Sequence, residues 1–313
     1  MITTLNAIAP IFLIILIGYF LYRSAIIGEQ VWSAIEHLCF YLLFPFLIVR
    51  TLSRANLGSV PVVDFTLVIV VAILGMSIAL IFAYSLLRKQ YPASGPSFTS
   101  VFQGATRFHG FVALAIIGPL YGDDGVTLTA IALAIMVPLL NTISVIVLSV
   151  YGHGASSIEP TNILKQIIKN PLIIACVAGL ILNRTGIPDI AFNAIEIIGN
   201  GGLGLALLAV GAGMRPGQAA RDKLLIFVGV FIRLIGMPAI VIFMAWIVGL
   251  EGLPRTIAII AGAVPTAASS YVMARKMGGN AELMSNIVTF QIIASFITLP
   301  FFIYLSDNLT RYL

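Results

Sequence analysis

Charged side chains are scarce in this chain. They make up 9% of its 313 residues, against about 25% in an average soluble domain, which excludes an ordinary soluble protein. Cysteine and histidine are scarce too, with 2 and 3 residues, and both cysteines (Cys39 and Cys176) lie inside apolar runs. These counts argue against a disulfide framework, a metal site and a bound cofactor. They also leave no nucleophile–base or metal constellation, so we expect no catalytic residues and no enzyme activity.

Apolar residues take the place of the missing charge. Hydrophobic side chains make up 60% of the chain, and its mean hydropathy is +1.08. Because a membrane-spanning helix needs about 20 apolar residues, the sequence predicts an all-α polytopic protein with ten spans in a lipid bilayer. The expected spans are 4–22, 31–52, 62–87, 98–121, 126–150, 167–183, 191–214, 223–249, 255–275 and 283–306.

The basic residues lie mostly at the ends of these apolar runs. The 17 lysines and arginines give a formal net charge of +5, but they are scattered and form no phosphate-binding patch, so we expect no nucleic-acid partner. With the N-terminus outside, ten of them fall in inner loops and five in outer segments, whereas Arg107 and Arg233 lie within spans. The positive-inside rule therefore predicts both termini on the outer (periplasmic) side of the cell (inner) membrane.

The sequence also repeats itself. A displacement of 161 aligns Pro10 with Pro171, Gly18 with Gly179, Arg23 with Arg184 and Arg54 with Arg215. A displacement of 158 aligns Gly104 and Ala105 with Gly262 and Ala263. We infer two repeats of five spans, residues 1–155 and 156–313. Because five is odd, the second repeat must be inverted in the membrane, as in many secondary transporters.

The ninth span contains a proline at its middle. Pro265 is followed by three hydroxyl residues, Thr266, Ser269 and Ser270, in an otherwise apolar stretch. Proline removes a backbone donor and clashes with the preceding turn, so the helix must kink or break there. Broken helices at mid-membrane form binding sites in transporters. The alternative is a kink whose own hydroxyls satisfy the freed backbone groups.

The fourth span carries polar residues that an apolar helix does not tolerate without a reason. The polar residues are Gln103, Arg107 and His109, and the glycine Gly110 follows them in the same span. An arginine at mid-bilayer costs at least about 2.5–3.5 kcal/mol and needs an anion or water. The functional interpretation is that Arg107 receives a substrate carboxylate. The structural alternative is a pair with a backbone carbonyl or with one of the two carboxylates well inside spans, Glu36 and Glu196.

Several segments resemble the auxin efflux carrier family, especially its bacterial members. They are Pro265 to Leu283 in and after span nine, Phe40 to Phe46 in span two, Arg233 to Pro238 in span eight and Thr298 to Pro300 in span ten. The resemblance implies the fold shared by bile-acid symporters and sodium/proton antiporters, in which broken helices 4 and 9 cross beside the substrate. It implies a scaffold of helices 1, 2, 6 and 7 and a transport domain of helices 3–5 and 8–10. It also implies an organic anion, with malonate and malate the examples among bacterial members.

One position departs from the family pattern. Where many members have asparagine two residues after the arginine of span four, this chain has His109. The plant hormone substrate is therefore not transferred to this chain.

We therefore predict a secondary transporter of the efflux-carrier type for a small organic anion, a mono- or dicarboxylate. It would act by alternating access at a midplane site where spans four and nine cross. The expected substrate-binding residues are Gln103, Arg107, His109, Gly110, Pro265, Thr266, Ser269 and Ser270. Two alternatives stay open: a sodium- or proton-coupled symporter of the same fold, and a membrane ligand sensor that does not transport. A homodimer also stays open.

Overall fold

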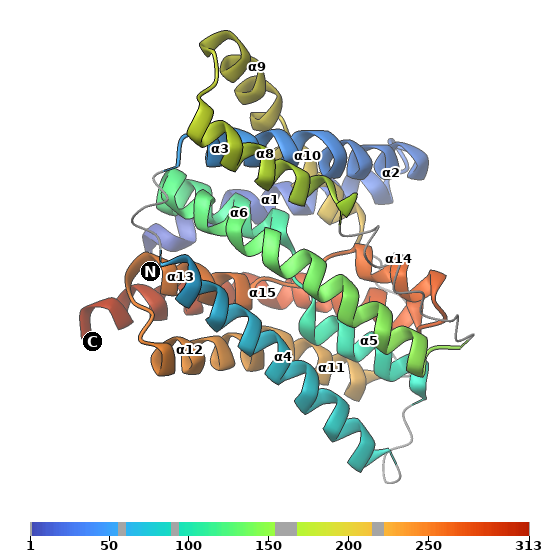
Figure 1. Ribbon diagram of the computed structural model, residues 1–313. Coiled ribbons are helices and arrows are strands. Elements are labelled where there is room, and N and C mark those ends of the chain that lie inside the picture. Colours follow the sequence, from blue (N-terminus) through green and yellow to red (C-terminus); the bar gives the residue numbers. More distant parts are fainter. Residues whose placement is uncertain (1, 56–60, 89–93, 154–167, 215–221, 313) are drawn as a thin grey trace. The chain divides into compact units, whose positions relative to one another are not determined.

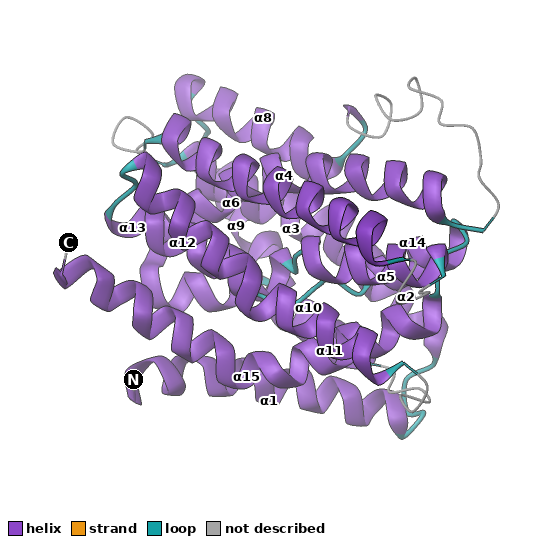
Figure 2. Cartoon of the chain, turned by 90° about the horizontal axis from the view of Figure 1, so that it is seen from below, coloured by secondary structure: helices purple, strands orange, loops and turns teal. Residues whose placement is uncertain are grey.

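The computed structural model describes residues 2–55, 61–88, 94–153, 168–214 and 222–312. Within these ranges every regular element is a helix (Figure 2). Six of the helical stretches are long and apolar enough to cross a membrane, and three shorter apolar helices accompany them. The helices occupy the positions of the predicted spans, and the chain is a multi-pass membrane protein. The direction in which each helix crosses the bilayer stays a prediction.

The chain divides into two compact units. The first comprises Met1–Pro61, Phe111–Ala134 and Pro160–Gly213, and the second comprises Val62–Gly110, Ile135–Glu159 and Met214–Leu313. The predicted boundary between repeats, at 155/156, lies outside the described residues. The expected scaffold and transport domains stay a prediction.

The first unit contains helices that follow apolar runs. They are α1 (Ile2–Arg23), α2 (Glu29–Leu38), the π-helix η1 (Cys39–Leu43), α3 (Phe44–Ser53), α8 (Pro171–Thr185), α9 (Asp189–Asn200) and α10 (Gly202–Ala212). Local signals set the ends of α8: Asn170 Oδ1 accepts from the Leu172 N–H at 2.9 Å, and Gly186 beyond its last residue has φ 82°. Asparagine caps and glycine terminators of this kind fix where a helix starts and stops.

Glycines allow helices of the first unit to approach closely. α1 packs along α10, and α3 packs along α8 and α9. A Cβ on Gly18 of α1 would clash with the Leu208 carbonyl oxygen, and one on Gly211 of α10 would clash with the Ile15 carbonyl oxygen. Only glycine fits at such a backbone contact, which is how membrane helices often pack.

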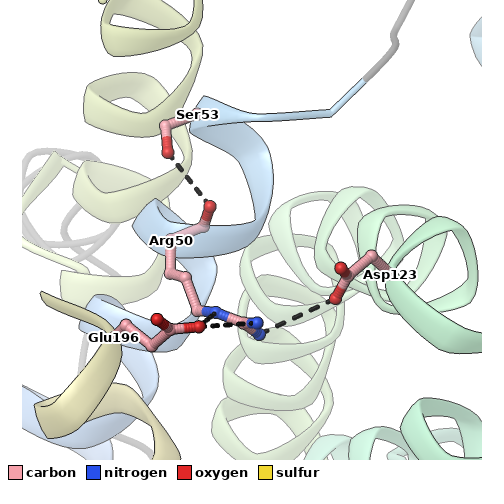
Figure 3. A network of polar contacts seen from close by, with 4 residues as sticks. All are labelled: Arg50, Ser53, Asp123 and Glu196. Atoms are coloured by element: carbon pink, nitrogen blue, oxygen red, sulfur yellow. Dashed lines mark hydrogen bonds and ion pairs between the residues drawn. The ribbon is translucent and has the colours of Figure 1, made fainter. Parts of the chain in front are cut away.

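An ion-pair network ties α3 to its neighbours in the first unit (Figure 3). The Arg50 guanidinium donates from Nε to Glu196 Oε1 at 3.0 Å, and its Nη2 lies 3.0 Å from the same oxygen. On its other side, Nη1 lies 3.7 Å from Asp123 Oδ1. Asp123 follows Gly122, whose non-helical backbone (φ 61°, ψ −156°) interrupts α6 (Gly110–Tyr151) between the predicted fourth and fifth spans. Glu196 is therefore the counter-charge of Arg50.

The second unit contains the remaining helices. They are α4 (Val62–Leu87), α5 (Gly95–Thr106), α11 (Lys223–Phe231), the π-helix η3 (Ile232–Gly236), α12 (Met237–Val248), α13 (Gly252–Ala263), α14 (Ser269–Lys276) and α15 (Ala281–Tyr312), with both ends of α6. α15 contacts α5, α11, α13 and α14, and it lies beside α13 in Figure 1. Four helices of this unit therefore share α15 as a common support.

Both predicted helix interruptions are present, and both lie in the second unit. α5 ends at Thr106, and Arg107 is extended (φ −70°, ψ 152°) before α6 begins at Gly110. α13 ends at Ala263, and Val264 is extended (φ −65°, ψ 149°) before α14 begins at Ser269. The second break has a covalent cause, because Pro265 has no N–H and disfavours a helical conformation in the residue before it.

Candidate functional site

The two helix breaks meet through the side chain of Thr266. Its hydroxyl lies 2.7 Å from the Gly104 carbonyl oxygen at the end of α5 and 3.1 Å from the carbonyl oxygen of Arg107. Its own backbone N–H donates to Gln291 Oε1 at 2.9 Å. Thr266 is fully buried, so these bonds replace the backbone partners that each helix loses where it breaks. The predicted residues Thr266 and Arg107 are thus brought together.

Gln291 of α15 also contacts both helix breaks, and the sequence patterns did not predict this role. Its side-chain Nε2 donates to the carbonyl oxygens of Gly104 at 2.8 Å and Gly229 at 3.0 Å. One buried amide thereby links α5, α11 and the break after α13. The sequence contains a signal for it, because a glutamine inside an apolar span is unusual and needs hydrogen-bond partners.

The Arg107 side chain turns to α14 and finds only neutral acceptors there. Nη2 donates to Ser269 Oγ at 3.3 Å, and Nη1 lies 3.3 Å from Met273 Sδ. Arg107 is 9% exposed. Within the described part of the chain no carboxylate lies at ion-pair distance from it, and Glu196 pairs with Arg50. The contacts described for the Arg107 guanidinium thus include neither a backbone carbonyl nor a glutamate, and the choice between the functional and the structural interpretation stays a prediction.

Two further predicted residues are buried polar groups without a hydrogen-bond partner among the described residues. Gln103 and Ser270 are both fully buried, and within the described ranges no group hydrogen-bonds the amide oxygen and nitrogen of Gln103 or the hydroxyl of Ser270. Burying such groups without a hydrogen bond costs about 1–3 kcal/mol each. Unsatisfied polar groups in the turns beside a helix break are groups that a polar ligand can satisfy.

The remaining predicted residues belong to the breaks themselves. His109 is buried and is the N-cap of α6, whose first residue, Gly110, is partly buried. Pro265 is buried inside the second break, and Ala268 is the N-cap of α14. Neither N-cap residue supplies a side-chain cap. Helix starts carry a partial positive charge and orphan N–H donors, which favour an anion.

Arg233 binds the C-terminal ends of α5 and α13, the helices that precede the two breaks. It lies in η3, is fully buried, and donates to the carbonyl oxygens of Val264 (2.8 Å), Ala261 (2.9 Å) and Thr106 (3.3 Å). Thr106 ends α5, and Ala261 and Val264 belong to the end of α13. Arg233 therefore differs from Arg107, because all the hydrogen bonds described for the Arg233 guanidinium go to backbone carbonyls and none of those of the Arg107 guanidinium does.

The family motif after the ninth span has a structural role. The Asn280 amide donates to Ser97 Oγ at 3.1 Å, its N–H donates to the Pro96 carbonyl at 3.1 Å, and its carbonyl accepts from Ser100 Oγ at 2.8 Å. Gly278, with φ 74°, comes so close to the His153 backbone that a Cβ would not fit. The loop between α14 and α15 is therefore fixed to the start of α5. These hydrogen bonds connect the helix after the second break, α14, to the helix before the first break, α5.

Apolar spanning helices and two breaks that meet around buried arginines define a class of protein. It is a polytopic helical membrane protein with the discontinuous helices typical of secondary transporters. A family model described as membrane transport protein matches residues 3–303. The chain belongs to this family of membrane transporters, and its resemblance to the auxin efflux carriers is confirmed.

Its relatives include prokaryotic and plant proteins. An uncharacterized transporter of Methanothermobacter thermautotrophicus is 22% identical over 299 residues, which are 94% of this chain and 96% of the relative. The uncharacterized transporter YfdV of Escherichia coli K12 is 24% identical over 307 residues, 95% of this chain and 96% of YfdV. Auxin efflux carrier component 3a of rice (Oryza sativa subsp. japonica) is 27% identical over 172 residues, 49% of this chain and 28% of the carrier.

Proposed function

We propose that this membrane transporter carries a small organic anion, a mono- or dicarboxylate, and that Arg107 is the counter-charge of the bound carboxylate. One observation carries the proposal: the Arg107 side chain is buried, yet the only partners described for its guanidinium are a hydroxyl and a thioether. A guanidinium keeps its charge and has five donors in a planar fork that matches a carboxylate. An anion that binds there would supply the charge that the protein does not.

Neighbouring groups would complete the recognition of the anion. Ser269 Oγ lies within hydrogen-bond distance of Arg107, and Gln103 and Ser270 have unused hydrogen-bonding capacity. The helix start at Ser269 directs partial positive charge to the break between α13 and α14. His109, Pro265 and Thr266 would shape the site, with Thr266 holding the two breaks together.

We also propose that the ten spans form two inverted repeats of five. The half-helices α5 and α13 have 12 residues each, and both end in the same extended conformation. The glycine that the repeat pairs with Gly18, Gly179, also faces a neighbouring backbone, with its Cβ position 3.4 Å from Val49 Cα. Two contacts at the breaks, Gly104 with Thr266 and Arg107 with Ser269, join residues 162 apart. Contacts at nearly the repeat displacement are expected where a pseudo-two-fold axis passes through the molecule.

The direction of transport is part of the proposal. The rice relatives are auxin efflux carriers by name, and we transfer from them the efflux direction only. An anion leaves a cell with a negative interior down the electrical gradient, at about 2.3 kcal/mol per charge for each 100 mV. Export of an anion therefore needs no coupling ion.

Counterflow in proteoliposomes tests the proposal. Vesicles loaded with unlabelled malonate or malate should accumulate the labelled anion through the parent protein. Arg107→Ala should lower the initial rate by roughly 10²-fold or more, because it removes one partner of a buried charge pair. Arg107→Lys keeps the positive charge but loses the planar, bidentate geometry of the guanidinium, so it should retain an intermediate rate.

Arg184→Ala is the matched control, because Arg184 is an exposed arginine at the end of α8. A folded Arg107→Ala protein that exchanges the anions at the parent rate would refute the role of Arg107. Saturable binding without counterflow would make the protein a sensor and refute transport.

A further inference from the structure

Arg233 is a full positive charge placed where two helices end. All three of its described hydrogen bonds go to backbone carbonyls, from Nε to Val264, from Nη2 to Ala261 and from Nη1 to Thr106. It has no exposed surface, and within the described residues no carboxylate lies at ion-pair distance from it. Carbonyl dipoles alone therefore balance the guanidinium.

These carbonyls form the kind of site that binds a metal cation in other carriers. The C-terminal end of a helix carries a partial negative charge, and two such ends, from α5 and α13, meet at Arg233. In transporters with discontinuous helices, half-helix C-terminal ends and unwound carbonyls coordinate the coupling Na⁺. Here a side chain of the protein takes the carbonyl oxygens that an ion would need.

A π-helix brings the arginine to this place. Arg233 lies in η3, the five-residue π segment Ile232–Gly236 between α11 and α12. A π turn inserts an extra residue into a helix and shifts the direction of its side chains, and such turns are frequent at functional sites. The neighbouring Gly229 carbonyl is satisfied separately, by Gln291. The π-helix η3 therefore places the Arg233 guanidinium at the ends of α5 and α13.

We propose that Arg233 acts as a tethered cation that permanently fills a monovalent-cation site formed by the carbonyls of Thr106, Ala261 and Val264. The protein then needs no sodium at this place, and removal of the guanidinium opens a site for a small monovalent cation. The inference concerns a cation and is independent of which anion is carried. It bears on the proposed function only by separating transport from sodium coupling at this site.

Melting temperature in detergent, followed by tryptophan fluorescence, tests the inference. The parent, Arg233→Gln and Arg233→Lys are compared in choline, sodium and guanidinium chloride at one ionic strength, with guanidinium far below denaturing concentrations. The parent and Arg233→Lys should melt at the same temperature in all three salts. Arg233→Gln should melt lower in choline and regain roughly 2–4 °C in sodium or guanidinium, because an ion that binds only the native state stabilises it.

Arg255→Gln is the control for loss of a buried arginine, since Arg255 is 6% exposed and lies in the first turn of α13. It should show no recovery with either ion. A cation response of Arg233→Gln no larger than that of Arg255→Gln would overturn the inference.

If the Arg233 variants do not fold, measurements on the parent protein alone test the inference. Its melting temperature and its anion counterflow should be equal in sodium and choline. A sodium-dependent gain in either would overturn the tethered-cation inference and leave the anion carrier standing. Loss of counterflow from the parent in both salts would refute the proposed function and leave this inference untouched.

Discussion

Two buried glutamines of the second unit differ in how their amides are used. Gln291 makes three hydrogen bonds, to Thr266, Gly104 and Gly229. Gln103 is equally buried, and neither its amide oxygen nor its amide nitrogen has a partner in the part of the chain that the structure describes. An unpartnered buried amide destabilises a protein, and such groups are kept where function requires them.

Replacing each glutamine by leucine should therefore have opposite effects on the stability of the free protein. Gln103→Leu should raise the free energy of unfolding by about 1–3 kcal/mol, since it removes an unsatisfied buried group. Gln291→Leu should lower it by about the same amount or more, since it removes three buried hydrogen bonds and takes away the acceptor of the Thr266 N–H. Melting temperatures in detergent without added anion measure both effects.

The same pair tests the role of Gln103 in binding. An added carboxylate should raise the melting temperature of the parent by mass action and raise that of Gln103→Leu less. If Gln103→Leu destabilises the free protein as much as Gln291→Leu does, the Gln103 amide is a structural group and not part of the site.

At the scale of helices, sequence patterns predicted the breaks and missed the contacts that hold them. Pro265 and the polar residues around Arg107 are local signals, because each disturbs an apolar helix by itself. The roles of Arg233 and Gln291 depend on which helix ends meet in space, and no local pattern encodes that. The π segments η1 and η3 were not predicted for the same reason, since packing between helices decides them.

The α1–α10 pair gives a prediction at this scale. Gly211 and Gly204 both lie on α10, but a Cβ at Gly211 would meet the backbone of Ile15 and Tyr19, whereas one at Gly204 would have nothing within 4 Å. Gly211→Ala should lower the free energy of unfolding by at least about 1–3 kcal/mol through overpacking.

Gly204→Ala is the control on the same helix. It should be neutral or stabilising by up to about 1 kcal/mol, because alanine has the higher helix propensity. Thermal unfolding in one detergent compares the two variants. Equal melting temperatures would show that α1 and α10 do not pack as described.

For the whole molecule, composition and charge predicted a polytopic helical protein, and the helices and the family confirm that class. Orientation across the membrane rests on the positive-inside rule, which uses only the few charges near the ends of the spans. The repeat supplies the missing constraint. If the halves are inverted, residues 161 apart must lie on opposite sides of the membrane.

Ser24 and Thr185 make this constraint testable. They are 161 apart, both are exposed, and they lie in the same unit, where Ser24 directly follows α1 and Thr185 is the last residue of α8. Both native cysteines are free and buried, so a new surface cysteine should dominate the labelling. In intact cells an impermeant maleimide should label Thr185→Cys and leave Ser24→Cys unlabelled until the membrane is permeabilised. Labelling of both from outside would contradict the inverted repeat, and labelling of Ser24→Cys alone would keep the repeat but place the termini inside.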